Sequence, residues 1–296
     1  MSTPSPRCCA DGAAAPLTMP GDLLALMWAP FLMCLVLTGI HAYLGIHVIA
    51  REVVFVDIAL AQIAALGATA AFLVGFTLES WLSYAFALAT TLLGALVLSL
   101  TRSRQRRVSQ EAVIGVVYAV SAAAAVLLVD RAPHGAEHLR GMLVGSILTV
   151  SGPDVAKVGA LYAVVGVFHW LCRRPFLLIS TDPDAAFREG WRVRLWDLLF
   201  YASFGLVVTS SVRIAGVLLV FSYLIVPALA GAALGGRLST RLMVGWAFGV
   251  LVSLVGIVGS ALLDLPTGAT VVCAFGLLLM LFWGIAGSPR RQPVAR

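Results

Sequence analysis

Three polar side chains that lie inside long apolar segments are the first candidates for chemistry in this sequence. They are His41, Asp57 and Gln62. Burying such groups in lipid is costly, so they usually mark ion or substrate pathways when they occur inside membrane spans. Imidazole, carboxylate and amide groups can all bind a divalent cation. We therefore predict that these three side chains contact a metal ion on a path through the protein, with Asp57 as the main contact.

Each of these residues also has a purely structural explanation. Asp57 could form an ion pair with Arg51 near the start of its helix. Gln62 could hydrogen-bond between helices. His47 and His169 are further candidate ligands, but both lie close enough to predicted helix ends to be hydrated. The sequence alone leaves these alternatives open.

The other reactive residue types form no enzyme motif. His134 and His138 fall in a polar loop, which is either simply solvated or a weak acceptor of metal. The sequence has no Gly-x-x-x-x-Gly-Lys-Ser/Thr, no His-Glu-x-x-His and no Gly-x-Ser-x-Gly. We therefore predict no catalytic residue and no bound cofactor, and any ATP that drives this protein must be hydrolysed by another subunit. The cysteines show no metal-ligand spacing: Cys8, Cys9, Cys34, Cys172 and Cys273.

The elements that must position these residues are membrane-spanning helices. The chain of 296 residues is 60% hydrophobic and 11% charged, with a mean hydropathy of +0.99. About 20 apolar residues are enough to cross the hydrocarbon core as a helix. We predict an all-α, polytopic transmembrane bundle of about nine helices, with approximate limits 23–49, 53–75, 81–100, 112–130, 155–172, 195–212, 214–235, 242–262 and 267–286.

The distribution of Lys and Arg predicts how the bundle is oriented. Arg102, Arg104, Arg106 and Arg107 crowd one loop, which places that loop in the cytoplasm. Alternation then puts fifteen of the 20 Lys and Arg residues inside and five outside. The N-terminus is predicted outside and the C-terminus inside. The net charge of +6 therefore indicates membrane orientation rather than nucleic-acid binding.

The chain divides into a leader at 1–22, expected to be disordered, a transmembrane domain at 23–288 and a cytoplasmic tail at 289–296. Residues 141–153 are apolar but too short to span, which favours a re-entrant or interfacial segment or a bend. Pro227 falls well inside a predicted span and predicts a kink there.

The polar loop 173–194 has the residues of a short helix. Asp182 is suited to the N-cap and Pro183 to the first helical position. Gly190 can end the helix in a left-handed conformation. We predict a two-turn helix from Pro183 to Glu189 on the cytoplasmic side, with an ordinary ordered loop as the alternative.

Five segments occur in order between about residues 30 and 285. They are Gly45–Arg51 with Asp57 and Gly67, Gly145–Ser151 with Asp154, Ser180–Gly190, Gly216–Val220 with Leu224–Ala228, and Asp264–Ala269. Together they resemble the permease subunits of zinc/manganese ABC importers. One departure is that Ala61 and Gln62 stand where members of that family often carry the His of an Asp-x-x-x-His pattern beginning at Asp57.

The resemblance implies a homodimer of permeases in the bacterial cytoplasmic (inner) membrane, with the path at the subunit interface. It also implies cytoplasmic ABC ATPase subunits, an external metal-binding protein and a transported divalent metal ion of the zinc, manganese or iron type. Loop 173–194 corresponds to the part that docks on the ATPase. The residues implied in that coupling are Thr181, Asp182, Pro183, Asp184, Ala185, Ala186 and Gly190.

Three other functions compete with this one. An ion-gradient-driven secondary transporter usually shows inverted repeats, and none is evident in the sequence. An ABC permease for a metal chelate such as a siderophore or cobalamin would need a wider path. The third is a membrane scaffold that transports nothing. An ATPase gene beside this one would favour the importer.

Overall fold

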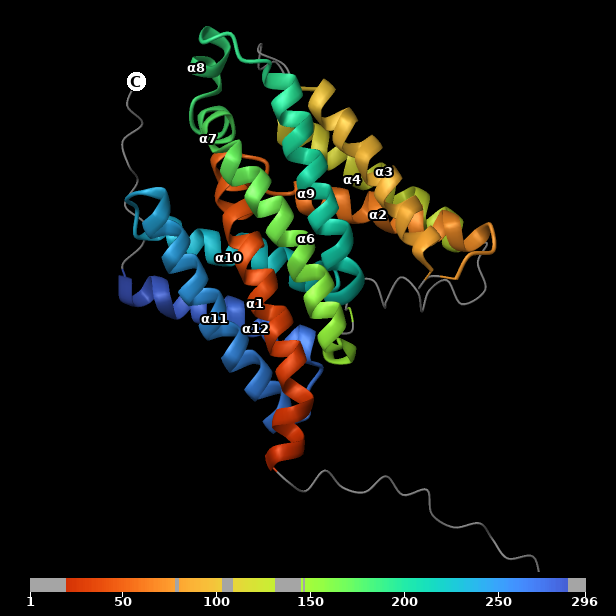
Figure 1. Cartoon of the computed structure of the whole chain (residues 1–296), viewed down its shortest axis with the longest axis vertical. Helices are drawn as coiled ribbons and strands as arrows, with labels where there is room; N and C mark the ends of the chain where they lie inside the picture. Colours follow the sequence, from red (N-terminus) through yellow and green to blue (C-terminus); the bar gives the residue numbers. More distant parts are fainter. Residues whose placement is uncertain (1–19, 78–79, 103–108, 131–144, 146, 287–296) are drawn as a thin grey trace, which may run out of the picture.

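The computed structural model describes residues 20–77, 80–102, 109–130, 145 and 147–286 (Figure 1). Within these residues every regular element is helical, which confirms the predicted all-α class. The elements are α1 (Pro20–Ala50), α2 (Val56–Leu73), α3 (Trp81–Leu100), α4 (Gln110–Val129), the short 3-10 helix η1 (Ile147–Thr149), α6 (Gly152–Leu171), α7 (Arg173–Thr181), α8 (Pro183–Arg188), α9 (Val193–Ala215), α10 (Val217–Ala233), α11 (Leu238–Leu263) and α12 (Thr267–Ala286).

Several predictions fall outside the described residues. They concern most of the leader 1–22, the tail 289–296, the loop histidines His134 and His138, and all but one of the four crowded arginines. The exception is Arg102. The first helix begins at Pro20, so the last three residues of the predicted leader, 20–22, belong to it.

Eight of the described helices are long and apolar enough to cross a membrane: α1, α2, α3, α4, α6, α9, α11 and α12. Large apolar side chains such as Leu93, Leu127 and Leu262 are exposed on their outer faces, as lipid contact requires. The remaining predicted span, 214–235, corresponds to α10, which is apolar but only 17 residues long. The chain is therefore a multi-pass membrane protein.

The predicted span 214–235 starts too early. Helix α9 continues to Ala215, and α10 begins only at Val217. The residue between them is Gly216, whose φ of 78° lies in the left-handed region that favours glycine. The turn at this glycine separates the two helices. Pro227 lies within α10, as predicted.

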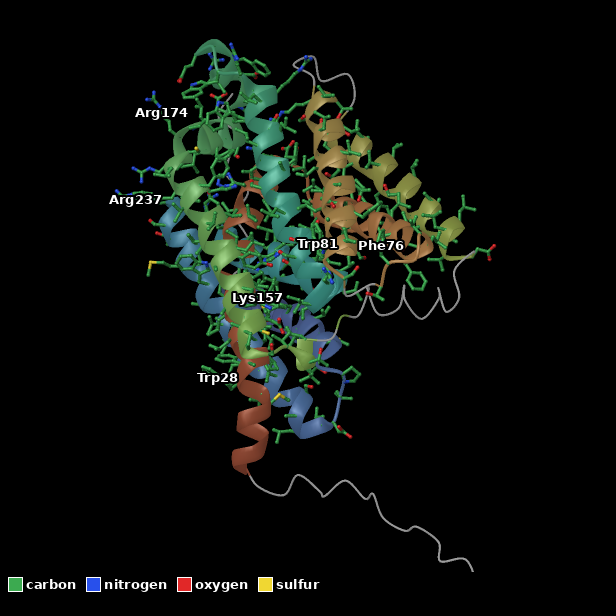
Figure 2. All side chains as sticks on the ribbon, turned by 45° about the vertical axis from the view of Figure 1, so that its right-hand side comes forward. Trp28, Phe76, Trp81, Lys157, Arg174 and Arg237 are labelled. Carbon is green, nitrogen blue, oxygen red and sulfur yellow. The ribbon has the colours of Figure 1, made fainter. Side chains whose placement is uncertain are left out.

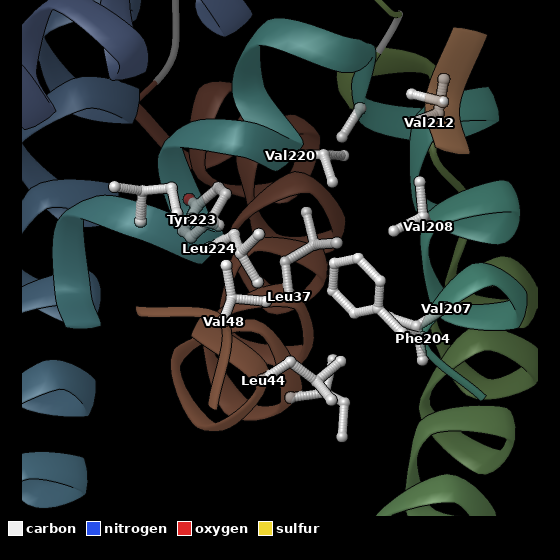
Figure 3. Packing of buried hydrophobic residues seen from close by; sticks show 14 of the residues in the cluster. Leu37, Leu44, Val48, Phe204, Val207, Val208, Val212, Val220, Tyr223 and Leu224 are labelled. Atoms are coloured by element: carbon white, nitrogen blue, oxygen red, sulfur yellow. The ribbon is translucent and has the colours of Figure 1, made fainter. Parts of the chain in front are cut away.

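The bundle has two groups of helices that meet at α9 (Figure 1). In one group α2 packs on α3 and α4. In the other, α1 packs on α10 and α11, and α12 packs on α10 and α11. Helix α9 contacts α3 and α2 of the first group and α10 of the second. Apolar side chains fill the core between α1, α9 and α10 (Figure 3), among them Leu37, Leu44, Val48, Phe204, Val207 and Leu224.

Glycines allow helices to touch backbone to backbone within each group. A Cβ at Gly45 of α1 would overlap the carbonyl oxygen of Leu224 in α10. A Cβ at Gly67 of α2 would come 2.8 Å from the carbonyl oxygen of Phe86 in α3. Small residues at such crossings are how membrane helices gain close packing.

The helix predicted in loop 173–194 is confirmed, one residue shorter than expected. Helix α8 runs from Pro183 to Arg188, and its N-cap Asp182 accepts a hydrogen bond of 2.8 Å from the backbone N–H of Ala185. Gly190 follows with a φ of 77°. The preceding helix α7 was not predicted. It buries Phe176, Ile179 and Ser180 and leaves both of its arginines exposed.

The short apolar segment 141–153 does not form a long helix where it is described. Helix η1 is a single turn, and α6 begins at Gly152. Asp154 closes a capping box by accepting hydrogen bonds from the backbone N–H and the hydroxyl of Ser151. The described part of this segment is therefore a bend that leads into the next helix, which is one of the predicted forms. Residues 141–144 and 146 lie outside the described chain.

Candidate metal path and buried charge network

Asp57 lies in the first turn of α2 and is completely buried. Both of its carboxylate oxygens lack a hydrogen-bond partner within the described residues. The alternative in which Asp57 pairs with Arg51 is not what the structure shows, because Arg51 pairs elsewhere. The start of a helix favours a negative charge, but it does not replace a hydrogen-bonded partner. A carboxylate in this position is available to a cation or a proton.

His41 is also completely buried, in the middle of α1. Its Nδ1 lies 2.9 Å from the carbonyl oxygen of Leu37, and its Nε2 lies 3.1 Å from the hydroxyl of Ser211 in α9. Ser211 is 2.5 Å from the hydroxyl of Tyr162, which in turn is 3.3 Å from Ser210. His41 is therefore part of a polar chain that runs from α1 to α9 and α6.

The structure does not gather the three predicted metal contacts into one cluster. Gln62 is half-buried, whereas Asp57 on the same helix is fully buried. The hydrogen bonds of His41 go to Leu37 and Ser211 and not to Asp57. Within the described residues no group of three or more His, Cys, Asp or Glu side chains comes together as a metal site. These residues can offer successive weak contacts rather than one tight cage.

A second buried carboxylate, Asp197 near the start of α9, forms ion pairs with two arginines, although its Oδ2 accepts no hydrogen bond from a described residue. Arg51 in the α1–α2 connection donates to its Oδ1 at 2.7 Å. Arg102, just after α3, lies 3.1 Å from its Oδ2 through Nε and 3.3 Å from its Oδ1 through Nη1. The Arg51 guanidinium also lies 3.9 Å above the ring of Phe200. Burial lowers the pKa of Arg51, and the charge of Asp197 opposes that shift.

This charge network reaches the segment implied in ATPase docking. Arg51 Nε donates to the hydroxyl of Ser180 in α7 at 2.8 Å. The same hydroxyl lies 2.8 Å from Nδ1 of His47 in α1. The network therefore joins α1, the α1–α2 connection, α7 and α9 and, through Arg102, the end of α3. We define it as Arg51, Asp197, Arg102, Ser180 and His47.

Helices α7 and α8, the segment implied in ATPase coupling, lie at one end of the bundle, beyond the ends of α1 and α9 (Figure 1). Ala186 is fully buried against Ile179 of α7 and Val193 of α9. The other residues implied in coupling are at least partly accessible: Thr181, Asp182, Asp184 and Gly190 are exposed, and Pro183 and Ala185 are half-buried. The buried side chain of Ala186 therefore anchors a small helix whose outer side chains are exposed to solvent.

Sequence reasoning missed Asp197 and Ser180 as partners of Arg51, and Arg102 as the second partner of Asp197. A signal was present, since Asp197 is an acidic residue inside the predicted span 195–212. Asp197 could have been predicted to have a positively charged partner, because a buried charge must have a counter-charge. Which arginine supplied that counter-charge was not readable, since Arg51 and Arg102 are 146 and 95 residues away from it in sequence.

A bundle of apolar helices with isolated buried polar groups, and a polar helix pair at one end, defines a polytopic membrane protein of the transporter class. More specifically, residues 24–285 match the family described as the ABC 3 transport family, and the chain belongs to it. This match covers almost all of the described helices.

Curated relatives are similar over a part of their length. The manganese transport system membrane protein MntC of Halalkalibacterium halodurans is 28% identical over 60% of this chain and 61% of its own. The manganese transport system membrane protein MntB of Synechocystis is 26% identical over 62% of this chain and 59% of its own. The matched part is less than two thirds of either relative.

The fold is shared with solved structures. One of them is PsaBC from Streptococcus pneumoniae in complex with Fab, with a TM-score of 0.75 and 19% identity. The superposition covers 92% of this chain and 98% of that one. At this identity the likeness supports the arrangement of the helices and says nothing of the transported ion.

Proposed function

We propose that this chain is the membrane-spanning permease of an ATP-driven importer of divalent transition metal ions. The observation that carries the proposal is the buried, unpartnered carboxylate of Asp57 in a chain of the ABC 3 transport family. Two relatives named for manganese transport support the choice of a metal ion as cargo. The chain is not itself an enzyme, because ATP hydrolysis belongs to a separate subunit.

In this proposal the metal ion enters from an external binding protein and meets weak contacts on its way to the cytoplasm. Asp57, His41 and Gln62 are the proposed contacts. Two oxygen donors and one imidazole suit manganese or iron at least as well as zinc. The absence of a histidine at Ala61 therefore makes manganese the first ion to test.

The proposed assembly is a homodimer of this chain in the bacterial inner membrane, with one ABC ATPase subunit docked on each α7–α8 segment. The exposed residues Thr181, Asp182 and Asp184 form the proposed docking surface. The start of α1, near Trp28, lies at the opposite end of the bundle from α7–α8, and Arg174 and Arg237 point outward nearer the α7–α8 end (Figure 2). This placement supports an external N-terminus.

The test is to purify the chain with its candidate ATPase and measure ATP hydrolysis and Mn²⁺ uptake in liposomes. We expect a stable complex whose ATPase activity and uptake are both lost in Asp184→Arg, which changes only an exposed side chain. Glu52→Arg is the matched control, since Glu52 is also exposed but lies outside α7–α8. A well-folded permease that recruits no ATPase and takes up metal on an ion gradient would contradict the proposal and support a secondary transporter.

A further inference from the structure

Two buried histidines near the α7–α8 end each have one ring nitrogen without a hydrogen-bond partner in the described part of the chain, and the proposed path does not include them. His47 comes from α1 and His169 from α6, and each is 1% exposed. Both rings pack edge-on against Tyr43, with centroid distances of 4.8 and 5.5 Å. Both also lie about the same distance from the ring of Phe200, 5.9 and 6.0 Å. The two imidazoles therefore share one small aromatic compartment.

The hydrogen bonds of Ser180 determine which nitrogen of His47 carries the proton. Its hydroxyl accepts from Arg51 Nε, and it can donate its single proton to the carbonyl oxygen of Phe176 at 2.7 Å. Its contact with His47 then requires Nδ1–H of His47 to donate. The opposite assignment makes one hydrogen bond fewer and leaves a buried N–H without an acceptor, which is rare. His47 Nε2 is left as a lone pair, buried and without a partner within the described residues.

The hydrogen bonds of Ser203 determine the protonated nitrogen of His169 in the same way. The hydroxyl of Ser203 donates to the carbonyl oxygen of Phe200 at 3.0 Å, so the contact of 2.8 Å with His169 requires Nε2–H to donate. His169 Nδ1 is then the buried lone pair, again with no partner in the described part of the chain. A histidine that donates one ring N–H to a protein oxygen and presents the other nitrogen bare has the arrangement found in metal ligands.

We propose that His47 Nε2 and His169 Nδ1 form a second contact point for a divalent transition metal ion, at the cytoplasmic end of the path. This inference rests on the proposed function for its direction of transport. Two imidazoles leave a tetrahedral ion such as zinc two ligands short, so the contact is weak. Arg51 donates to the same Ser180 hydroxyl as His47, and its positive charge favours release of the ion into the cytoplasm.

The test uses variants that remove one lone pair each and retain each serine contact. His47→Asn keeps a donor at the position of Nδ1 for Ser180, and His169→Gln keeps a donor at the position of Nε2 for Ser203. Co²⁺ is the probe, because its visible absorption reports nitrogen ligands. The full-length permease is titrated in detergent without a histidine tag. Ser222→Ala is the matched control, because the hydroxyl of Ser222 bonds to the carbonyl oxygen of Leu218 in its own helix and belongs to neither proposed metal contact.

We expect the double variant to lose the absorption of nitrogen-bound Co²⁺ or to bind Co²⁺ at least tenfold more weakly. Ser222→Ala should retain this absorption. Unchanged Co²⁺ binding in a double variant with the wild-type melting temperature overturns the inference. Since this measurement needs no ATPase and no transport, its failure is distinct from the failure of the proposed function, which uptake in liposomes decides.

Discussion

The starts of α2 and α9 each bury one aspartate completely, and the two carboxylates are in opposite situations. Asp197 is held by Arg51 and Arg102. Asp57 has neither an ion pair nor a hydrogen bond to a described residue. Both are equally removed from solvent, so burial alone does not distinguish a structural charge from a functional one. We expect the presence of a counter-charge to distinguish them, because a protein must compensate a charge that it keeps permanently buried.

Removal of the paired carboxylate is the strongest test of this difference between the two aspartates. In Asp197→Ala, Arg51 would remain buried without its counter-charge. We expect the loss of about 3–5 kcal/mol of stability, seen as a lower melting temperature and a lower yield of folded protein in detergent. Asp184→Ala, at an exposed position in α8, is the control and should change stability by less than about 0.5 kcal/mol. Equal melting temperatures for both variants would contradict the structural role of Asp197.

The unpaired carboxylate should show the reverse pattern. Asp57→Asn removes a charge that no described residue compensates, so the fold should tolerate it. Uptake of Mn²⁺ should fall by about 10- to 100-fold, because a contact to a charged group contributes about 1.5–3 kcal/mol. Thr69→Val, which alters a buried hydroxyl bonded only within α2, should leave uptake unchanged. Normal uptake by a well-inserted Asp57→Asn protein would show that this carboxylate is not on the path.

The contribution of Ser180 tests whether the paired region acts as a network. Ser180→Ala deprives both Arg51 Nε and His47 Nδ1 of their partner. We expect a cost of about 1–3 kcal/mol in the free energy of unfolding. Ser222→Ala is the matched control, since the hydroxyl of Ser222 bonds only to the carbonyl oxygen of Leu218 in its own helix. If the two variants are equally stable, Ser180 is not an essential member of the network.

A third aspartate, exposed rather than buried, gives the smallest expected effect. Asp182 caps α8, and Asp182→Ala should destabilise that helix by about 1 kcal/mol without changing global stability. Hydrogen exchange of the α8 amides should accelerate accordingly. Asp182→Ser retains a capping oxygen and should restore slow exchange. Acceleration that spreads to α9 would mean that α8 and α9 unfold together.

Local sequence patterns were sufficient to predict most of the fold. The apolar segments gave the positions of all nine predicted spans, and the Asp182–Pro183 pair gave α8, because these signals involve neighbouring residues. The α9–α10 boundary was placed wrongly, since a single glycine turn carries little weight in an apolar run. Helix α7 was missed because it is short and only one of its faces is apolar.

The candidate site was less readable, because its contacts join residues far apart in the chain. The partner of Arg51 lies 146 residues away, and that of His47 lies 133 residues away. Asp57, His41 and Gln62 were recognisable as polar residues in apolar segments, and their role on the path remains a prediction. That Asp57 lacks a partner could be learned only from the packing of the helices around it.

The two glycine crossings have a mechanical consequence. At Gly45 and Gly67 one helix backbone rests directly on the next, so α1 with α10, and α2 with α3, cannot slide past one another without a steric clash. Helix α9 also packs closely on α3, where Thr91 and Thr209 share a hydrogen bond of 3.1 Å and a Cβ at Gly205 would come 2.7 Å from Thr91 Cγ2, whereas its contact with α10 is sparse. Under the proposed function, we therefore expect alternating access to move α2, α3 and α9 as one rigid body and α1 with α10 as another, with the relative motion at the α9–α10 contact.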